Sequence, residues 1–152
     1  MPISESRLIE KEITLRSLRL TKEIMETRRS MIRWLALSLG IINPGESRQS
    51  ALSVLDALLY YQFSLKKDPT VEELSERIEA TWGAINEKTL RYHLLQFKKA
   101  DILNNYKGKY ALVQQDLGER YDEVSWISDH LSREISEIKN NISIVLKELK
   151  NR

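Results

Sequence analysis

The chain has 152 residues, which is the size of one domain, or of one small domain with helical extensions. Its composition, 41% hydrophobic and 30% charged with 5 Gly and 3 Pro, excludes a disordered chain and a loop-rich one. The lack of Cys excludes a disulfide framework, a thiolate metal site and a cysteine nucleophile, and it suits an intracellular protein.

The chain is also expected to have no membrane span and no signal peptide. No stretch approaches the roughly eighteen uncharged apolar residues that a spanning helix needs. The segment 1–12 carries charges of both signs and has no continuous apolar core. We therefore expect a cytoplasmic protein.

The first segment, 1–40, predicts one long helix from Ser4 to Leu39. It is rich in good helix formers, and Gly40 is a stop signal at its end. Apolar residues recur along one face, interrupted by Ser17 and Thr27: Ile13, Leu20, Ile24, Met31 and Trp34. Such a helix would be about 54 Å long, longer than a small domain is wide, so it is expected to pack on a partner elsewhere.

The middle segment, 45–113, begins with two predicted helices. Ser47 is expected to cap the first, which ends near Phe63. The stretch Thr70-Val71-Glu72-Glu73 has the spacing of a capping box, in which the Thr hydroxyl and the Glu73 carboxylate each bind the other's backbone amide. A short second helix is therefore predicted after Thr70.

A third helix and a hairpin complete the middle segment. Asn86 is expected to cap a helix that runs to about Ala100, with Leu90, Leu94 and Phe97 facing inward. Two short apolar runs follow it, and Lys107-Gly108 lies between them. This pattern predicts a tight two-stranded hairpin.

The last segment, 114–152, has the most regular pattern in the chain. Steps of four and three lead through ten positions, of which only Ser128 is polar: Leu117, Tyr121, Val124, Ser128, Leu131, Ile135, Ile138, Ile142, Val145 and Leu149. This repeat predicts a coiled-coil helix over about 115–150, through which two copies of the chain dimerise. The alternative is an ordinary core helix packed within its own chain.

The order of helix, short helix, turn, capped helix and hairpin resembles a winged helix-turn-helix domain. The resemblance depends mainly on residues 85–103, INEKTLRYHLLQFKKADIL, with the small polar cap Asn86 and an apolar pair that begins the wing. Asp101 stands where the family usually has Gly, and Asp tolerates the left-handed backbone conformation needed there. Residues 110–121, YALVQQDLGERY, are similar to the way such regulators pass from the wing into a long dimerisation helix.

The resemblance implies a mainly α fold with a small β-hairpin wing, a winged helix-turn-helix domain flanked by long N- and C-terminal helices. That order is also similar to the dimeric regulators of the multiple-antibiotic-resistance and PadR types. It implies a homodimer that binds double-stranded DNA through its third middle helix.

Positive charge is concentrated where this resemblance places the DNA-binding surface. Residues 86–113 contain six basic and two acidic residues, net +4, whereas 45–85 contain four basic and seven acidic, net −3. DNA phosphates attract such a cluster. The residues expected to contact DNA are Asn86, Lys88, Arg91, Tyr92, Lys98, Lys99, Lys107, Lys109 and Arg48.

Different roles are expected within this set. Four residues near the start of the helix are candidates for contacts with base edges in the major groove: Asn86, Lys88, Arg91 and Tyr92. An Arg side chain can bind guanine through two hydrogen bonds. The other four lysines, Lys98, Lys99, Lys107 and Lys109, are candidates for phosphate contacts. Arg48 opens the first middle helix, where free amides can hold a phosphate. The alternative for each single cation is an ordinary solvated helix face.

The flanking segments carry opposite charges. Residues 1–40 contain eight basic and five acidic residues, net +3, and 114–152 contain six and eight, net −2. This difference favours packing of the first long helix against the last. The alternative is that Arg28, Arg29 and Arg33 extend the basic surface toward DNA.

No pattern in the sequence indicates catalysis. His93 and His130 have no neighbours at metal-ligand spacing, and there is no Gly-rich phosphate loop or nucleophile elbow. We expect no enzyme activity, metal or cofactor, and His93 is expected at the edge of the third helix or facing DNA. The tryptophans Trp34, Trp82 and Trp126 are expected in core or dimer packing, the alternative being a pocket for a small-molecule effector.

The sequence therefore predicts a transcriptional regulator that binds specific DNA sites as a homodimer. The first alternative is a winged-helix scaffold for protein interactions, which the acidic remainder of the middle segment favours. The second is a nucleoid protein that binds DNA without sequence preference.

Overall fold

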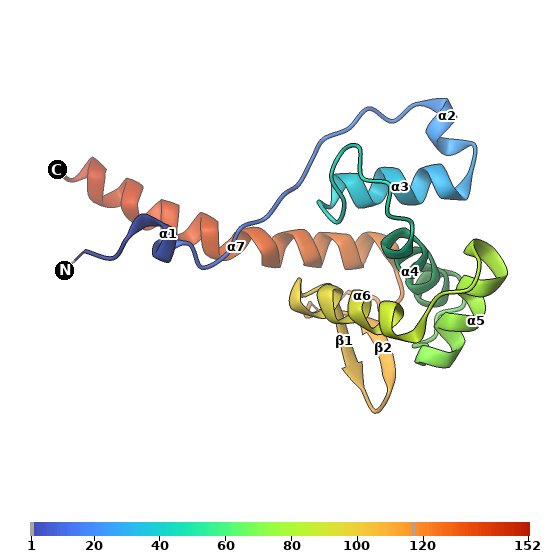
Figure 1. Ribbon diagram of the computed structural model, residues 1–152. Coiled ribbons are helices and arrows are strands. Elements are labelled where there is room, and N and C mark those ends of the chain that lie inside the picture. The colour runs from blue at the N-terminus through green and yellow to red at the C-terminus, as the bar shows by residue number, and fades with distance from the viewer. Residues whose placement is uncertain (1, 117) are drawn as a thin grey trace. The chain divides into compact units, whose positions relative to one another are not determined.

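A computed structural model describes residues 2–116 and 118–152, and these divide into two compact units, one up to Arg48 and one from Gln49 onward. We call these the N-terminal and C-terminal units. Helices hold 58% of the residues, and the strands form one two-stranded antiparallel hairpin. The prediction of a mainly helical chain with a small hairpin and a long C-terminal helix is confirmed (Figure 1).

The N-terminal unit contains three short helices in place of the single long helix expected. They are α1 (Glu5–Leu8), α2 (Lys22–Met25) and α3 (Arg28–Ser38). The prediction of a continuous helix from Ser4 to Leu39 is therefore wrong, although Gly40 does follow the end of α3 in a left-handed conformation, with φ of +71°.

Hydrogen bonds between the non-helical segment and α3 explain this difference. The Arg16 guanidinium donates to the carbonyl oxygens of Leu37 and Ile42, at 2.9 Å each, and the Arg16 amide donates to the Ser38 carbonyl. Thr27 caps α3 by accepting from the Ser30 amide at 3.1 Å, so the polar residue that interrupts the helical pattern starts a new helix.

The C-terminal unit is built around α4 (Ser50–Leu59), in which every residue from Ala51 onward is buried. A π-helical turn, η1 (Tyr60–Ser64), continues it to the end that the sequence predicts. The start differs from the prediction, because Gln49 rather than Ser47 occupies the N-cap position and makes no side-chain cap bond.

Two helices pack against α4: α5 (Val71–Trp82) and α6 (Glu87–Lys99). Thr70 caps α5 with the predicted capping box, since its side chain accepts from the Glu73 amide and the Glu73 side chain accepts from the Thr70 amide. The strands β1 (Leu103–Tyr106) and β2 (Lys109–Leu112) follow α6 and pair in the predicted hairpin.

The last helix, α7 (Glu123–Lys150), begins eight residues later than about 115, where the sequence analysis starts it. Asp122 caps it by accepting from the Ser125 amide at 2.8 Å. Tyr121 precedes the helix with φ of +67°, and its hydroxyl donates to Asp68 at 2.9 Å. Tyr121 therefore lies outside the helix in which the sequence analysis expects it, and Leu117, the first residue assigned to the seam, lies outside the described residues.

Replacement of Gly40 by Ala should destabilise the N-terminal unit more than the same change at Gly45. Both glycines have positive φ, but a Cβ at Gly40 would lie 2.4 Å from the Thr14 carbonyl oxygen, whereas at Gly45 it would meet nothing within 4 Å. We expect Gly40→Ala to lower the free energy of unfolding by at least about 1 kcal/mol more than Gly45→Ala, measured by urea denaturation. Equal losses would show that the close approach of Thr14 is not maintained.

Candidate nucleic-acid interface

The orientation of α6 is set by its apolar face. Leu90, Leu94 and Phe97 are buried, as predicted, and the helix contacts α4, α5 and β1 through this side. The Asn86 side chain caps the helix by accepting from the Lys88 amide at 2.7 Å. The opposite face of α6 is therefore turned to solvent.

A four-residue turn, 83–86, joins α5 to α6. Gly83 lies at the end of α5 with φ of +104°, and its amide donates to the Ile78 carbonyl at 3.1 Å. Residues with side chains rarely adopt this backbone conformation, so the glycine lets the chain leave α5 sharply. The two helices and their turn thus form one supported element.

The exposed face of α6 contains the residues that the sequence predicts for DNA contact. The outward-facing members are Lys88, Arg91, Tyr92, Lys98 and Lys99. Arg91 forms an ion pair with Glu87 at 3.3 Å, and both side chains remain more than half exposed. Because a surface pair of this kind is weak, it leaves the guanidinium available to another acceptor.

Leu95 also belongs to this face, although the sequence analysis did not select it. It is 49% exposed, and it follows Lys88 and Tyr92 at helical spacings of seven and three. The spacing could have identified it, but an apolar residue in a helix is more often assigned to the core. The structure thus adds an apolar contact point to the cationic face.

The hairpin presents a second set of cations. Lys107 and Gly108 are the two central residues of its turn, with φ of +52° and +77°, which is the pattern of a type I′ turn. Lys107 and Lys109 are exposed, while the Lys109 backbone bridges to Thr70 at the start of α5. The bridge ties the hairpin to the helices beside it.

An exposed aromatic residue at the hairpin tip was also missed. Tyr106 is 72% exposed, and the Lys107 ammonium lies 5.4 Å from its ring centroid. No periodic pattern in the sequence marks a tyrosine at the end of a strand as exposed rather than buried. Its cross-strand neighbour Lys109 is the signal that could have identified it.

Arg48 and Asn86 differ from the other predicted residues. Arg48 is exposed but is the last residue of the N-terminal unit, so it is not among the residues that the C-terminal unit brings together. Asn86 is exposed, and its carboxamide oxygen is used by the helix cap. Its amide group is the part that can act as a donor.

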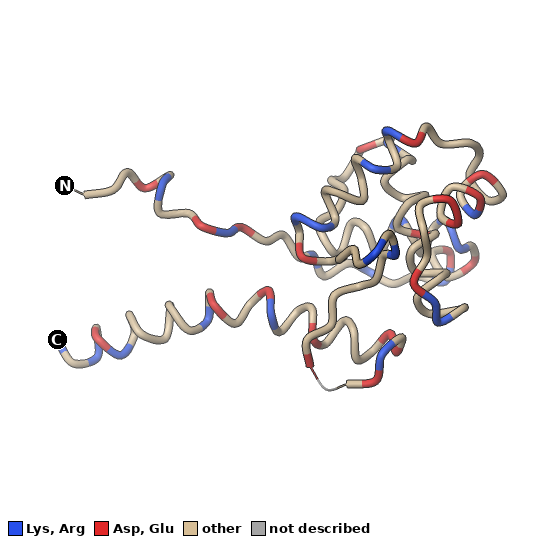
Figure 2. The backbone as a smooth tube through the Cα atoms, turned by 90° about the horizontal axis from the view of Figure 1, so that it is seen from below, with Lys and Arg blue, Asp and Glu red and all other residues tan. Residues whose placement is uncertain are grey.

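Charges of both signs occur along the whole chain (Figure 2). Within the C-terminal unit the acidic side chains Glu72, Glu76 and Glu79 are exposed on α5, whereas the exposed cations gather on α6 and the hairpin. The expected division of charge between these elements is therefore present at the surface.

His93 occupies a different place from the one expected. It is buried, and its Nε2 lies 2.9 Å from the Ser50 hydroxyl, so it ties α6 to the start of α4. The prediction of an edge or DNA-facing position is wrong, because His93 follows Leu90 by three residues and shares its inward face.

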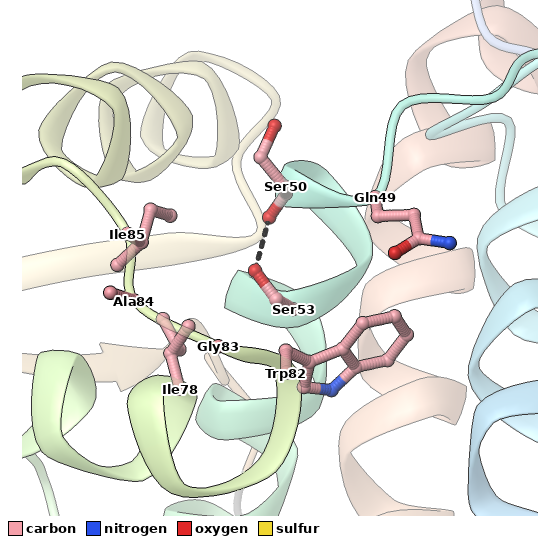
Figure 3. A pocket seen from close by; sticks show the side chains of 8 residues that line it. All are labelled: Gln49, Ser50, Ser53, Ile78, Trp82, Gly83, Ala84 and Ile85. Carbon is pink, nitrogen blue, oxygen red and sulfur yellow. Dashed lines mark hydrogen bonds between the residues drawn. The ribbon is translucent and has the colours of Figure 1, made fainter.

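A small cavity lies between the start of α4 and the turn that precedes α6 (Figure 3). Its volume is about 180 Å³, and Trp82 and Ile85 line it together with the serines of α4. The Trp82 indole donates to Asp56 at 2.8 Å, which fixes this wall. Because ligand pockets usually measure roughly 300–1,000 Å³, this cavity does not support an effector site.

The other two tryptophans have packing partners within their own units. The Trp34 indole donates to the Arg19 carbonyl at 2.8 Å, and Trp126 is buried at the start of α7, stacked against His130 with ring centroids 5.5 Å apart. Trp126 also lies 5.9 Å from Phe63 between ring centroids.

Two charged residues join α7 to the segment that follows β2 and to the turn that follows α6. Asp129 accepts from the backbone amides of Gln115 and Asp116, at 3.0 and 3.1 Å. Arg133 donates to Asp129 at 2.8 Å and to the Val113 carbonyl at 3.1 Å. We call this arrangement the α7 clamp.

Arg133 also pairs with Asp101, which follows α6 and has the left-handed conformation expected of it, with φ of +59°. Burial raises the pKa of Asp129, but the hydrogen bonds from Arg133 and from the Gln115 amide outweigh burial and hold the pKa below its ordinary value. The sequence contains the Asp129 and Arg133 pair at helical spacing, but not the loop amides that it binds.

The described residues contain no group of three or more His, Asp or Glu side chains placed to hold a metal ion. No described helix combines the length and the apolar character needed to cross a membrane. No protein-family model, curated protein or solved structure matches the chain.

Replacement of Asp129 by Asn should destabilise the C-terminal unit in a pH-dependent way. A depressed folded-state pKa means that the stabilisation is complete above the unfolded value of about 3.9 and is lost as the pH falls through the folded-state pKa. We expect Asp129→Asn to lower the free energy of unfolding by about 2 kcal/mol at pH 7, with the difference shrinking below about pH 4.

Urea denaturation across this pH range measures the effect, and Glu137→Gln on the exposed surface of α7 is the matched control. A difference between wild type and Asp129→Asn that stayed constant with pH would contradict the assigned ionisation of the α7 clamp.

Proposed function

We propose that the chain is a winged helix-turn-helix protein that binds specific double-stranded DNA sites as a homodimer and regulates transcription at the nucleoid. The observation that carries this proposal is the outward face of α6, where Lys88, Arg91 and Tyr92 are all exposed. In this reading α5, its turn and α6 are the helix-turn-helix, and β1 and β2 are the wing.

The start of α6 supplies the groups that can read base edges. Arg91 can place two donors on guanine O6 and N7, and Lys88 lies one turn before it on the helix. Leu95 adds an apolar surface of the kind that contacts a thymine methyl group. These side chains project from a helix held by buried contacts, so the backbone that carries them is in place before DNA binds.

The remaining cations are placed to neutralise phosphates rather than to read sequence. Lys98 and Lys99 lie at the end of α6, and Lys107 and Lys109 lie on the wing. Compact ammonium groups on flexible side chains are point charges, which suits contacts that position the protein on the duplex. Arg48 is a further candidate for a phosphate contact.

Replacement of Arg91 by Ala should relax sequence preference, whereas replacement of Lys107 by Ala should weaken binding to all duplexes alike. Loss of the guanidinium removes about 1–3 kcal/mol of discrimination at one base pair. Fluorescence anisotropy with a selected duplex and a random duplex measures both affinities.

The matched control for Arg91→Ala is Glu87→Gln, which removes the ion-pair partner of Arg91 but keeps the guanidinium. We expect this control to bind DNA at least as tightly as the native chain. Unchanged affinity of both Arg91→Ala and Lys107→Ala for every duplex would contradict the assigned roles.

DNA affinity should fall steeply as salt concentration rises. With about eight to ten phosphate contacts per dimer, the slope of log affinity against log salt concentration is expected to lie near −7 to −9. Titrations from about 50 to 200 mM salt measure this slope. An affinity that hardly changes over this range would contradict phosphate contacts as the main source of binding.

Two other functions remain as defined alternatives. The exposed acidic side chains on α5 favour a scaffold that binds proteins, in which case no duplex would bind. The lysines of α6 and the wing favour an architectural DNA-binding protein, in which case binding would depend on salt but not on sequence. The same titrations separate all three functions.

A further inference from the structure

The apolar stripe along α7 faces away from its own unit. It occupies positions a and d of a seven-residue repeat, and we call it the α7 seam: Val124, Ser128, Leu131, Ile135, Ile138, Ile142, Val145 and Leu149. Val124 and Leu149, at its two ends, are each 65% exposed, and Ile142 near its middle is 54% exposed. Leu131 and Ile138 are half-buried.

The opposite side of α7 holds the helix on its own unit. Trp126 and Arg133 occupy position f, which lies across the helix from the seam, and they make the contacts with Phe63 and Val113 described above. After Glu134 no residue of α7 is buried, and the helix extends beyond the other elements of its unit (Figure 1). The seam is thus free of the contacts that anchor the helix.

We infer that the α7 seam pairs with the same seam of a second copy, with the two helices parallel and in register. This inference deepens the proposed function, because its role in DNA binding rests on that proposal. One feature of the helix distinguishes the parallel arrangement from the antiparallel one.

That feature is the polar residue in the seam. In a parallel pair in register, Ser128 of each chain faces Ser128 of the other, so the two hydroxyls can bond to each other. In the antiparallel pair that covers the whole seam, each Ser128 would instead face the apolar side chain of Val145. A polar residue at position a commonly selects the register in which it meets its own kind.

Parallel pairing has a consequence for the α6 helices. The seam begins at the end of α7 that carries the rest of the unit, so a parallel pair holds both units at one end of the coil. Antiparallel pairing would separate them along a helix about 42 Å long. Only the parallel arrangement holds both candidate DNA-binding faces beside one short stretch of duplex.

Cysteine crosslinking of the full chain tests the orientation, because the native sequence has no Cys. In a parallel pair Leu149→Cys meets its own copy, and so does Val124→Cys, so each variant alone should form a covalent dimer on mild oxidation. The control Lys147→Cys lies at position f and should crosslink at least about tenfold more slowly, because the two sulfurs are held apart.

Antiparallel pairing would place position 149 of one chain opposite position 124 or 131 of the other. A covalent dimer that forms only when Leu149→Cys is mixed with Val124→Cys would therefore overturn the parallel arrangement. No crosslinking in any sample beyond that of Lys147→Cys would overturn it as well.

Sedimentation of the native chain gives the number of copies. We expect two copies of the native chain in the assembly. The variant Ile142→Lys should sediment as a monomer that keeps its fold, because Ile142 is exposed in the single chain. Ile138 and Val145 at position d also suit three-stranded coils, so a native monomer or trimer would overturn the inference. Neither experiment involves DNA, so a failure of DNA binding would leave their results unchanged.

Discussion

Burial of one face of α6 decides what the C-terminal unit presents to solvent. Leu90, Leu94 and Phe97 fill the space beside α4, which is itself buried along nearly its whole length. A helix with one face fixed in a close-packed core cannot rotate about its axis without opening cavities or forcing clashes. Apolar contacts therefore set the direction in which the cationic face of α6 points.

Local signals explain why this part of the fold could be predicted from the sequence. The Thr70 capping box, the Asn86 cap and the Lys107-Gly108 turn each act within a few residues, so a short stretch of sequence contains both partners of the interaction. The exposed cations of the candidate interface followed directly from the inward positions of α6. Leu95 and Tyr106 were missed because residue type alone does not reveal the exposure of an apolar or aromatic side chain.

The N-terminal unit and the start of α7 could not be predicted because their partners are distant in the sequence. Arg16 binds carbonyl groups more than twenty residues away, and Tyr121 binds a carboxylate more than fifty residues away. A helical repeat shows only how residues are spaced along the chain. It does not show whether hydrogen bonds to distant residues will replace those of a helix. Arg133 is a similar case, since its position on α7 was predictable and the carbonyl that it binds was not.

The turn at the hairpin tip also bears on the stability of the chain. A type I′ turn is most stable with Asn or Gly at its first central position, and a long side chain at positive φ costs roughly 1–2 kcal/mol. The chain nevertheless has Lys107 there. A hairpin sequence selected only for stability would have Asn at this position. The ammonium group of Lys107 therefore lies at the tip at a measurable cost in the free energy of unfolding.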